Sequence, residues 1–316
     1  MEFKGMTPLF SVIIPTHNRF PVLKRVLQSL EAQAGSPPFE VIVCDDGSTD
    51  ATPRELPGLR FSFPFTILSL PQGGPAKARN AGVRRAEGAF IAFFGDDTTI
   101  KADCLSLHAA AHEARPGSTA ILGQVVWARE LHVTRFMRYI ADYGLQFGYR
   151  IIPDPENVPF NFFYTSNISL PRRLFQEAGG FDETFPFAAW EDIELAYRLQ
   201  KDHGMRMAYE SGAVTYHDHP TTIASFLVRQ NKSGRAAAVF REKHPEMDGF
   251  LGAPLARTIP DAPSRAVQFK ARVALLFERT PFPIPVRWYR EIMEDAYLRG
   301  LREALALSGD AALRKE

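Results

Sequence analysis

Short apolar runs that end in acidic or glycine-containing turns recur through the first hundred residues and constrain the fold more than any other feature. The runs are Phe10–Ile14, Glu40–Cys44, Phe65–Leu70 and Ala89–Phe94. Their length and their β-branched or aromatic content predict buried strands. Segments with apolar residues at helical spacing, Val22–Gln33 and Ala76–Ala86, lie between them. This alternation predicts an α/β domain with a mainly parallel sheet flanked by helices.

Polar side chains follow three of these strands, at the point where each strand ends. They are Pro15, Thr16 and Arg19 after the first strand, Asp45 and Asp46 after the second, and Asp96 and Asp97 after the fourth. Open α/β sheets bind ligands in the crevice at the carboxyl ends of their strands. The sequence therefore predicts a ligand site that these residues line.

The rest of the chain is less regular. We expect helices at Thr134–Tyr149, Arg172–Ala178 and Trp190–Lys201, two strands at Met205–Glu210 and Ala213–His217, and a mostly helical region from Thr222 onward. Prolines near residues 249–264 indicate a linker. We expect a main domain over residues 1–245, with halves of about 8–125 and 126–245, and a helical C-terminal extension over 246–316.

Composition excludes several classes of protein. Hydrophobic residues make up 45% of the 316, so a sizeable core can form, and the net charge of +1 argues against a nucleic-acid partner. The chain has two cysteines, Cys44 and Cys104, which are too few for a disulfide framework, and Cys44 lies in an apolar run. We find neither a signal-peptide core nor 18 consecutive apolar residues, so we expect a cytoplasmic protein without a spanning helix.

Several motifs occur in a fixed order along the chain. They are Val12–Arg19 (VIIPTHNR), Val41–Asp50 (VIVCDDGSTD), Gly74–Gly82 (GPAKARNAG), Phe94–Asp97 (FGDD), Gly179–Glu183 (GGFDE) and Trp190–Leu195 (WEDIEL). In this order they resemble the family 2 glycosyltransferases, over roughly residues 10–219. The resemblance implies a GT-A fold and transfer of a sugar from a nucleotide-sugar donor, with Mn²⁺ or Mg²⁺ as cofactor. It also assigns Pro15, Thr16 and Arg19 to the donor side.

The turn after the second strand has the acceptors that a base N–H and a ribose need. The resemblance implies that Asp45 or Asp46 contacts the nucleobase, and the sequence does not separate the two. A helix cap by Ser48 or Asp50 is the structural alternative.

The helix after Gly74 carries cations in its first turn. Lys77, Arg79 and backbone N–H groups could face a diphosphate, and the alternative is a solvated helix face. Asn80 could contact either backbone or ligand.

Asp96 and Asp97 repel each other at a buried strand end unless a cation lies there. Mg²⁺ and Mn²⁺ prefer such oxygen ligands. The resemblance implies a ribose contact for Asp96 and a metal ligand for Asp97, although Gly95 stands where many members carry a first aspartate. His217 is a further candidate metal ligand, with His219 two residues on and a structural role as the alternative.

Glu191 and Asp192 begin a predicted helix, whose N-terminus favours their ionised forms. The resemblance implies that Asp192 is the general base, which takes the acceptor hydroxyl proton in an inverting transfer, with Glu191 beside it. Helix-start acids without a catalytic role are the alternative.

Two other functions are weighed against this one. A sugar-nucleotide pyrophosphorylase should carry a glycine-rich loop after its first strand, where this chain has Pro15–Arg19, and an inactive binding module should lack Asp96, Asp97 or Asp192. Polymer-making members carry Gln-x-x-Arg-Trp, but Ile284 precedes Arg287 and Trp288 here. We therefore expect transfer of a single sugar, from a UDP-sugar, to an acceptor hydroxyl on a glycan or a lipid-linked precursor.

Residues 264–290 are basic and amphipathic, with six Arg or Lys against Glu278 alone. Such a segment can lie on an anionic membrane surface, which would place the protein at the inner face of the membrane. The alternative is a helix packed on the core or on a second copy in a homodimer.

Overall fold

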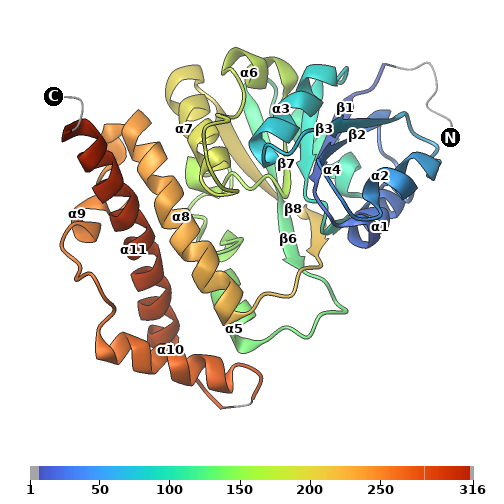
Figure 1. Cartoon of the computed structure of the whole chain (residues 1–316). Helices are drawn as coiled ribbons and strands as arrows, with labels where there is room; N and C mark the ends of the chain where they lie inside the picture. The colour runs from blue at the N-terminus through green and yellow to red at the C-terminus, as the bar shows by residue number, and fades with distance from the viewer. Residues whose placement is uncertain (1–6, 281, 314–316) are drawn as a thin grey trace. The chain divides into compact units, whose positions relative to one another are not determined.

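The computed structural model describes residues 7–280 and 282–313 and divides the chain into two compact units (Figure 1). The first unit comprises the chain up to Leu131 together with Gly144–Thr184 and Glu191–His219. The second comprises His132–Tyr143, Phe185–Trp190 and the chain from Pro220 onward. The expected division near residue 245 stays a prediction. Within the described residues no helix is both long and apolar enough to span a membrane.

An eight-stranded sheet in the order β3-β2-β1-β4-β7-β6-β8-β5 forms the centre of the first unit. The strands are β1 Phe10–Thr16, β2 Phe39–Asp46, β3 Phe65–Leu70, β4 Phe90–Phe94, β5 Thr98–Ile100, β6 Thr119–Trp127, β7 Asn167–Pro171 and β8 Arg206–His217. β1 to β4 pair in parallel, as do β6 and β8, whereas β7 and β5 run antiparallel to their neighbours. The mainly parallel sheet is thus confirmed, and the carboxyl ends of β1, β2 and β4 meet at one edge.

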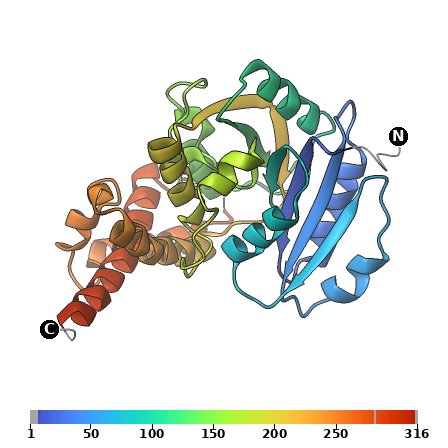
Figure 2. The same cartoon turned by 90° about the horizontal axis from the view of Figure 1, so that it is seen from above.

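Helices cover both faces of this sheet. Their bounds are α1 Phe20–Glu31, α2 Thr52–Glu55, α3 Pro75–Arg85, α4 Cys104–Ala114, α6 Arg172–Glu177 and α7 Glu191–His203. Alternate residues of β1 point to opposite faces, so Ile13 packs with α3, α6 and α7 while Val12 and Ile14 pack with α1 and α4. Figure 2 shows α1 and α3 on opposite sides of the first three strands. Cys44 is fully buried, as expected.

Two expectations about local structure are wrong. Residues 206–217 form one strand, β8, rather than two, because the irregularity opposite Gly123 and Gln124 shifts the register without ending the strand. The expected helix over 134–149 is shorter, since α5 spans Arg135–Asp142 and Gly144 then takes a positive φ of 77°. Strands β5, β6 and β7 and helix α4 were not predicted from the sequence.

The second unit is helical and contains α5, α8 Ile223–Lys243, α9 Ala253–Ala256, α10 Arg265–Phe277 and α11 Val286–Leu313. Helices α8 and α11 approach closely where each has a glycine. A Cβ at Gly234 would lie 1.9 Å from the Tyr297 carbonyl oxygen, and one at Gly300 would lie 1.9 Å from that of Asn231. Phe136 of α5 packs against Phe226 of α8 in the same unit.

Candidate active site

The loop after β1 is tied to the turn after β2 by Asn18, a residue that the analysis of the sequence left without a role. Asn18 has a positive φ of 55°, which asparagine tolerates better than most residues. Its backbone N–H donates to Ser48 Oγ at 2.9 Å, and its Oδ1 accepts from the N–H groups of Thr49 and Asp50 at 2.7 and 3.1 Å. This side chain therefore fixes two of the predicted donor-binding segments against each other.

Asp45 and Asp46 both shape the turn that carries them. Asp45 Oδ1 accepts from the Ser48 N–H at 3.0 Å, and the two Asp46 oxygens accept from the N–H groups of Gly73 and Gly74 at 2.7 and 2.9 Å. Asp46 thereby links β2 to the glycines that precede α3. The buried carboxylates are held in place by backbone donors, and Asp50, a residue of the capping alternative, accepts from the Thr52 N–H at 2.9 Å.

Asp96 and Asp97 lie together at the end of β4 with one cation between them. Arg19 Nη1 donates to Asp96 Oδ1 at 3.0 Å and to Asp97 Oδ2 at 2.7 Å, and Thr16 Oγ1 donates to Asp96 Oδ2 at 2.8 Å. The Arg19 side chain is 41% exposed, whereas the two carboxylates are buried. Burial and the charge of Asp97 raise the pKa of Asp96, and Arg19 opposes this. The structure thus brings β1 and β4 residues together as the sequence predicted.

His217 reaches the same carboxylate from the far part of the sheet, because β8 ends opposite β5. His217 Nε2 lies 3.5 Å from Asp97 Oδ2, and the Asp218 N–H donates to the Asp97 carbonyl oxygen at 2.8 Å. Burial would raise the pKa of Asp97, but the hydrogen bond and charge of His217 and the charges of Arg19 and His219 outweigh it and lower that pKa to about 2. Asp97 is therefore ionised across the physiological range.

Asp97 and His217 suit a divalent cation. Their facing O and N atoms, 3.5 Å apart, are near the separation of about 3 Å expected for two neighbouring ligands of one octahedral ion. Carboxylate oxygen suits Mg²⁺ and Mn²⁺, and imidazole is a common metal ligand. A Cβ at Gly95 would lie 2.9 Å from Asp97 Oδ1, so the glycine leaves room for this carboxylate. The described residues contain no cluster of three or more candidate ligands, so donor phosphates or water would complete the shell.

Helix α3 contributes side chains in two directions. The Lys77 stem packs on Gly73, where a Cβ would lie 2.5 Å from Lys77 Cδ. Arg79 and Asn80 are 9% and 8% exposed and bind protein groups instead of facing solvent. Asn80 exchanges hydrogen bonds with the backbone of Phe181, at 2.8 and 3.0 Å. In this arrangement Asn80 joins α3 to the glycine-rich segment before α7.

Glu191 and Asp192 begin α7 as predicted, and they differ in environment. Glu191 is 3% exposed, its Oε1 accepts from Arg79 Nη1 at 3.1 Å, and its Oε2 has no hydrogen-bond partner among the residues that the structure describes. Asp192 is half-buried, and its Oδ1 accepts from the Ile193 N–H at 2.9 Å. The helix N-terminus is expected to favour the ionised forms of both acids, but burial opposes this and raises the pKa of each.

Burial and the charge of Asp192 raise the pKa of Glu191 to about 7, against the lowering effect of Arg79. Burial also raises the pKa of Asp192, but Arg79 and backbone N–H groups oppose the rise. Neighbouring carboxyls with unequal environments divide acid and base roles between them. Asp192 is thus better suited than Glu191 to be the charged member of the pair.

The carboxyl edge of the sheet carries a carboxylate pair and a histidine, a second acidic pair begins α7, and the sheet with its flanking helices has the architecture of the GT-A glycosyltransferases. The model of glycosyl transferase family 2 matches residues 11–177. The chain belongs to glycosyltransferase family 2, a family of enzymes.

Among curated proteins, the chain is 30% identical over 281 residues to validoxylamine A glucosyltransferase of Streptomyces hygroscopicus subsp. limoneus, covering 76% of this chain and 58% of that one. It is 30% identical over 239 residues to the pre-mycofactocin glycosyltransferase of Mycobacterium tuberculosis, covering 75% and 48%. The chain therefore spans only about half of the length of these relatives.

Solved structures agree on the fold. The mannosyltransferase PcManGT from Pyrobaculum calidifontis, in complex with GDP-Man and Mn²⁺, aligns with a TM-score of 0.61 at 18% identity, covering 95% of this chain and 88% of that one. Residues 1–349 of S. aureus TarS, in complex with UDP-GlcNAc, align with a TM-score of 0.54 at 19% identity, covering 95% and 92%.

Proposed function

We propose that this protein is an inverting glycosyltransferase that moves a single sugar from a nucleotide-diphosphate sugar to an acceptor hydroxyl on a glycan or a lipid-linked precursor. The observation that carries the proposal is the meeting of Asp96, Asp97 and His217 at one sheet edge, with Arg19 between the carboxylates. Two carboxylates side by side at a strand end repel each other, and a divalent cation that binds there with a diphosphate would offset the repulsion.

The residues of the donor side have distinct roles in this proposal. Asp45 or Asp46 contacts the nucleobase, Pro15 and Thr16 line the first strand's end, and Asp96 contacts the ribose. Asp97 and His217 would hold Mn²⁺ or Mg²⁺, which supplies positive charge against the leaving diphosphate. Arg19 and Lys77 supply further cationic donors, and Arg79 and Asn80 act there through the position of α3.

Asp192 performs the proton transfer on the acceptor side. As the acceptor oxygen forms its bond to the anomeric carbon, the bond from that carbon to the diphosphate breaks, and the hydroxyl proton moves to Asp192. Attack opposite to the leaving group inverts the anomeric configuration. Glu191 supports the pair through its bond to Arg79.

A uridine nucleotide is the proposed donor base. The TarS structure with UDP-GlcNAc supports this choice, whereas the PcManGT complex contains GDP-Man. A panel of UDP-, GDP- and dTDP-sugars should therefore be tested for thermal stabilisation with Mn²⁺, because selective binding to the folded state raises the melting temperature.

Turnover tests the proposal directly. Release of the nucleoside diphosphate from the stabilising donor should be measured with Mn²⁺, with Mg²⁺ and after exhaustive chelation. We expect activity to fall on chelation and to return when the metal is restored. Unchanged turnover without metal would remove Asp97 and His217 from their proposed role, and turnover that yields a retained anomer would exclude the inverting mechanism.

A further inference from the structure

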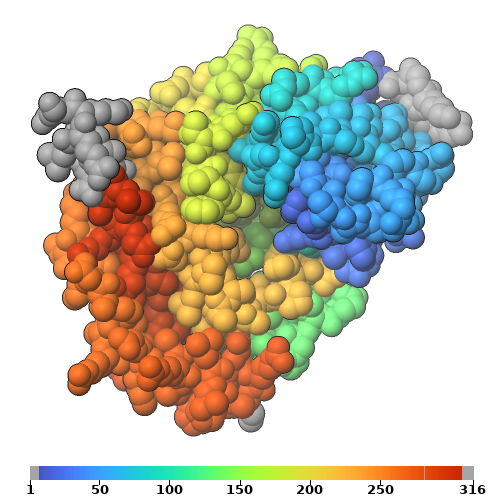
Figure 3. Space-filling view, viewed as in Figure 1, coloured from blue at the N-terminus to red at the C-terminus, as the bar shows by residue number. Residues whose placement is uncertain are grey.

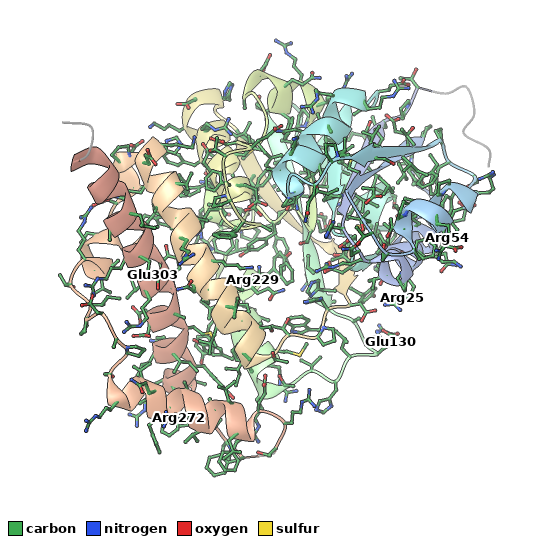
Figure 4. The ribbon with its side chains drawn as sticks, in the orientation of Figure 1. Arg25, Arg54, Glu130, Arg229, Arg272 and Glu303 are labelled. Atoms are coloured by element: carbon green, nitrogen blue, oxygen red, sulfur yellow. The ribbon has the colours of Figure 1, made fainter. Side chains whose placement is uncertain are left out.

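Helix α10 presents an alternating row of basic and apolar side chains to solvent. Arg265, Phe269, Arg272 and Leu276 follow one another at intervals of four, three and four residues, and Arg279 continues the row three residues later in the turn after the helix. These intervals place the first four on one side of α10, and Arg279 lies just beyond its end. We name these five residues the α10 stripe. The orange side chains of α10 form part of the outer surface in Figure 3, and Arg272 is labelled on this helix in Figure 4.

The apolar members of the stripe are unusually exposed for their size. Phe269 is 61% exposed and Leu276 is 73% exposed. Ala274, on the opposite side of α10, is fully buried, so this helix packs against its own unit through its other face. Phe282, which follows the helix and packs against Phe277, is 48% exposed as well. The packing of α10 against its own unit therefore leaves these apolar side chains exposed to solvent.

The stripe also carries uncompensated positive charge. Within residues 7–280 and 282–313, no acidic side chain lies within ion-pair distance of Arg265, Arg272 or Arg279. The nearby acids are occupied elsewhere, since Glu278 accepts from the Ile223 N–H at 2.6 Å and Glu291 pairs with Lys270. The surface thus combines three free guanidinium groups with two large apolar side chains.

We propose that the α10 stripe docks the protein on an anionic membrane surface. Arginine stems lie along apolar surface while their guanidinium groups bind lipid phosphates, and phenylalanine and leucine enter the boundary between headgroups and acyl chains. The centre of a protein–protein interface is depleted of charge, whereas charged and apolar residues alternate along this stripe. The alternation therefore favours a membrane surface over a protein partner. A symmetric contact with a second copy would bring the arginines against one another. The inference stands apart from the proposed transfer reaction.

Vesicle flotation tests this with the full chain. We expect binding to phosphatidylcholine vesicles that contain phosphatidylglycerol, weaker binding at high salt, and none to pure phosphatidylcholine. The triple substitution Arg265→Glu, Arg272→Glu and Arg279→Glu should lower the partition constant at least about a hundredfold. The double substitution Phe269→Ser and Leu276→Ser should also lower it, without changing its salt dependence.

A matched variant elsewhere on the surface separates this docking from nonspecific adsorption. Arg54, labelled in Figure 4, has a side chain that is 75% exposed, and Leu307 is 70% exposed. Arg54→Glu with Leu307→Ser should bind vesicles like the parent, and all variants should keep its melting temperature. No binding to anionic vesicles, or equal binding by stripe and control variants, overturns the proposal. Self-association that the stripe variants abolish, with no vesicle binding, overturns it in favour of a second copy.

Discussion

Arg79 Nη1 donates to Glu191 Oε1 at 3.1 Å, in a buried ion pair that joins the donor-side helix α3 to the start of α7. The Arg79 guanidinium also lies 5.6 Å from the centre of the Phe181 ring. Because Glu191 is the neighbour of Asp192, one cation on α3 influences both acids. The pair therefore couples the helix that follows Gly73 and Gly74 to the proposed catalytic base.

Replacing Arg79 should shift the pH dependence of catalysis. The Arg79 charge lowers the pKa of both Glu191 and Asp192, so its loss raises both. In Arg79→Met the acidic limb of kcat/KM should therefore move to higher pH, whereas Arg79→Lys, which keeps the charge, should retain most of the parent profile. If the acidic limb of kcat/KM lies at the same pH in the parent, in Arg79→Met and in Arg79→Lys, Arg79 has only a structural role. Arg79→Met should also lower stability by about 3–5 kcal/mol, since it leaves Glu191 unpaired.

The β1 to β4 half of the sheet was predictable because each buried strand there is a continuous apolar run that ends in a distinctive turn. β7 was not, since its Asn167 and Ser169 are polar yet buried, and they interrupt the apolar pattern. Their partners, His108 and His112, come from α4 and cannot be identified from neighbouring residues.

The acids of the site were predictable from short motifs, but their partners were not. The position of Arg79, in the first turns of a helix after two glycines, predicts a phosphate ligand. Its distance to Glu191, 112 residues along the chain, is set by the packing of α3 and α7 on the same face of the sheet. Asn18 was missed for a similar reason, because its positive φ and its bonds to the β2 turn are tertiary features.

Arg19 should compete with the metal for Asp97. Its Nη1 atom contacts the same Oδ2 atom that faces His217, so the guanidinium supplies the positive charge that a cation would bring. We expect Arg19→Met to bind Mn²⁺ several-fold more tightly in the absence of donor, as measured by the loss of the free Mn²⁺ signal in electron paramagnetic resonance. Arg54→Met on α2, where Arg54 pairs with Glu55, is the control. Weaker Mn²⁺ binding in Arg19→Met would mean that Arg19 organises the site instead.

Two buried histidines should make the fold sensitive to acid. His108 and His112 both hydrogen-bond Ser169 Oγ, at 2.8 and 2.7 Å. Burial lowers the pKa of His108 to about 4 and that of His112 to about 3, below the ordinary value of 6.5. The unfolded chain therefore takes up protons below about pH 6.5 while the folded state does not, so the free energy of unfolding falls by about 1.4 kcal/mol per pH unit for each histidine.

Urea denaturation at pH 7.5, 6 and 5 measures this slope. His112→Phe keeps a ring against Phe90, whose centre lies 4.1 Å from the His112 ring, but cannot be protonated. Its stability should fall about half as steeply with decreasing pH, whereas His203→Gln at the end of α7 should follow the parent. A parent protein whose stability is level from pH 7.5 to 5 contradicts the assignment of neutral buried rings.

Gly234 should be intolerant of any side chain. A methyl group there meets the Tyr297 carbonyl oxygen at 1.9 Å, so α8 and α11 must separate to admit it. Alanine in a helix is otherwise favoured over glycine by about 1 kcal/mol. We expect Gly234→Ala to lower the free energy of unfolding by about 1–3 kcal/mol in spite of this propensity. Gly249→Ala, with no atom within 4 Å of the added methyl, should be near neutral. Equal stability of the two variants in thermal denaturation would show that the helices are not in contact at Gly234.

Asp192→Asn should remove the general base while preserving its surroundings. Asparagine keeps the size of the side chain and an oxygen that can accept from the Ile193 N–H, now 2.9 Å from Asp192 Oδ1, but it cannot take the acceptor proton. We expect turnover at saturating donor and acceptor to fall about a hundredfold or more, the usual scale for a positioned base. Donor affinity should change little, because the residue acts on the acceptor. Glu191→Gln, which retains an acceptor for Arg79, should lose less. Turnover of Asp192→Asn within a few-fold of the parent would assign the base to another residue.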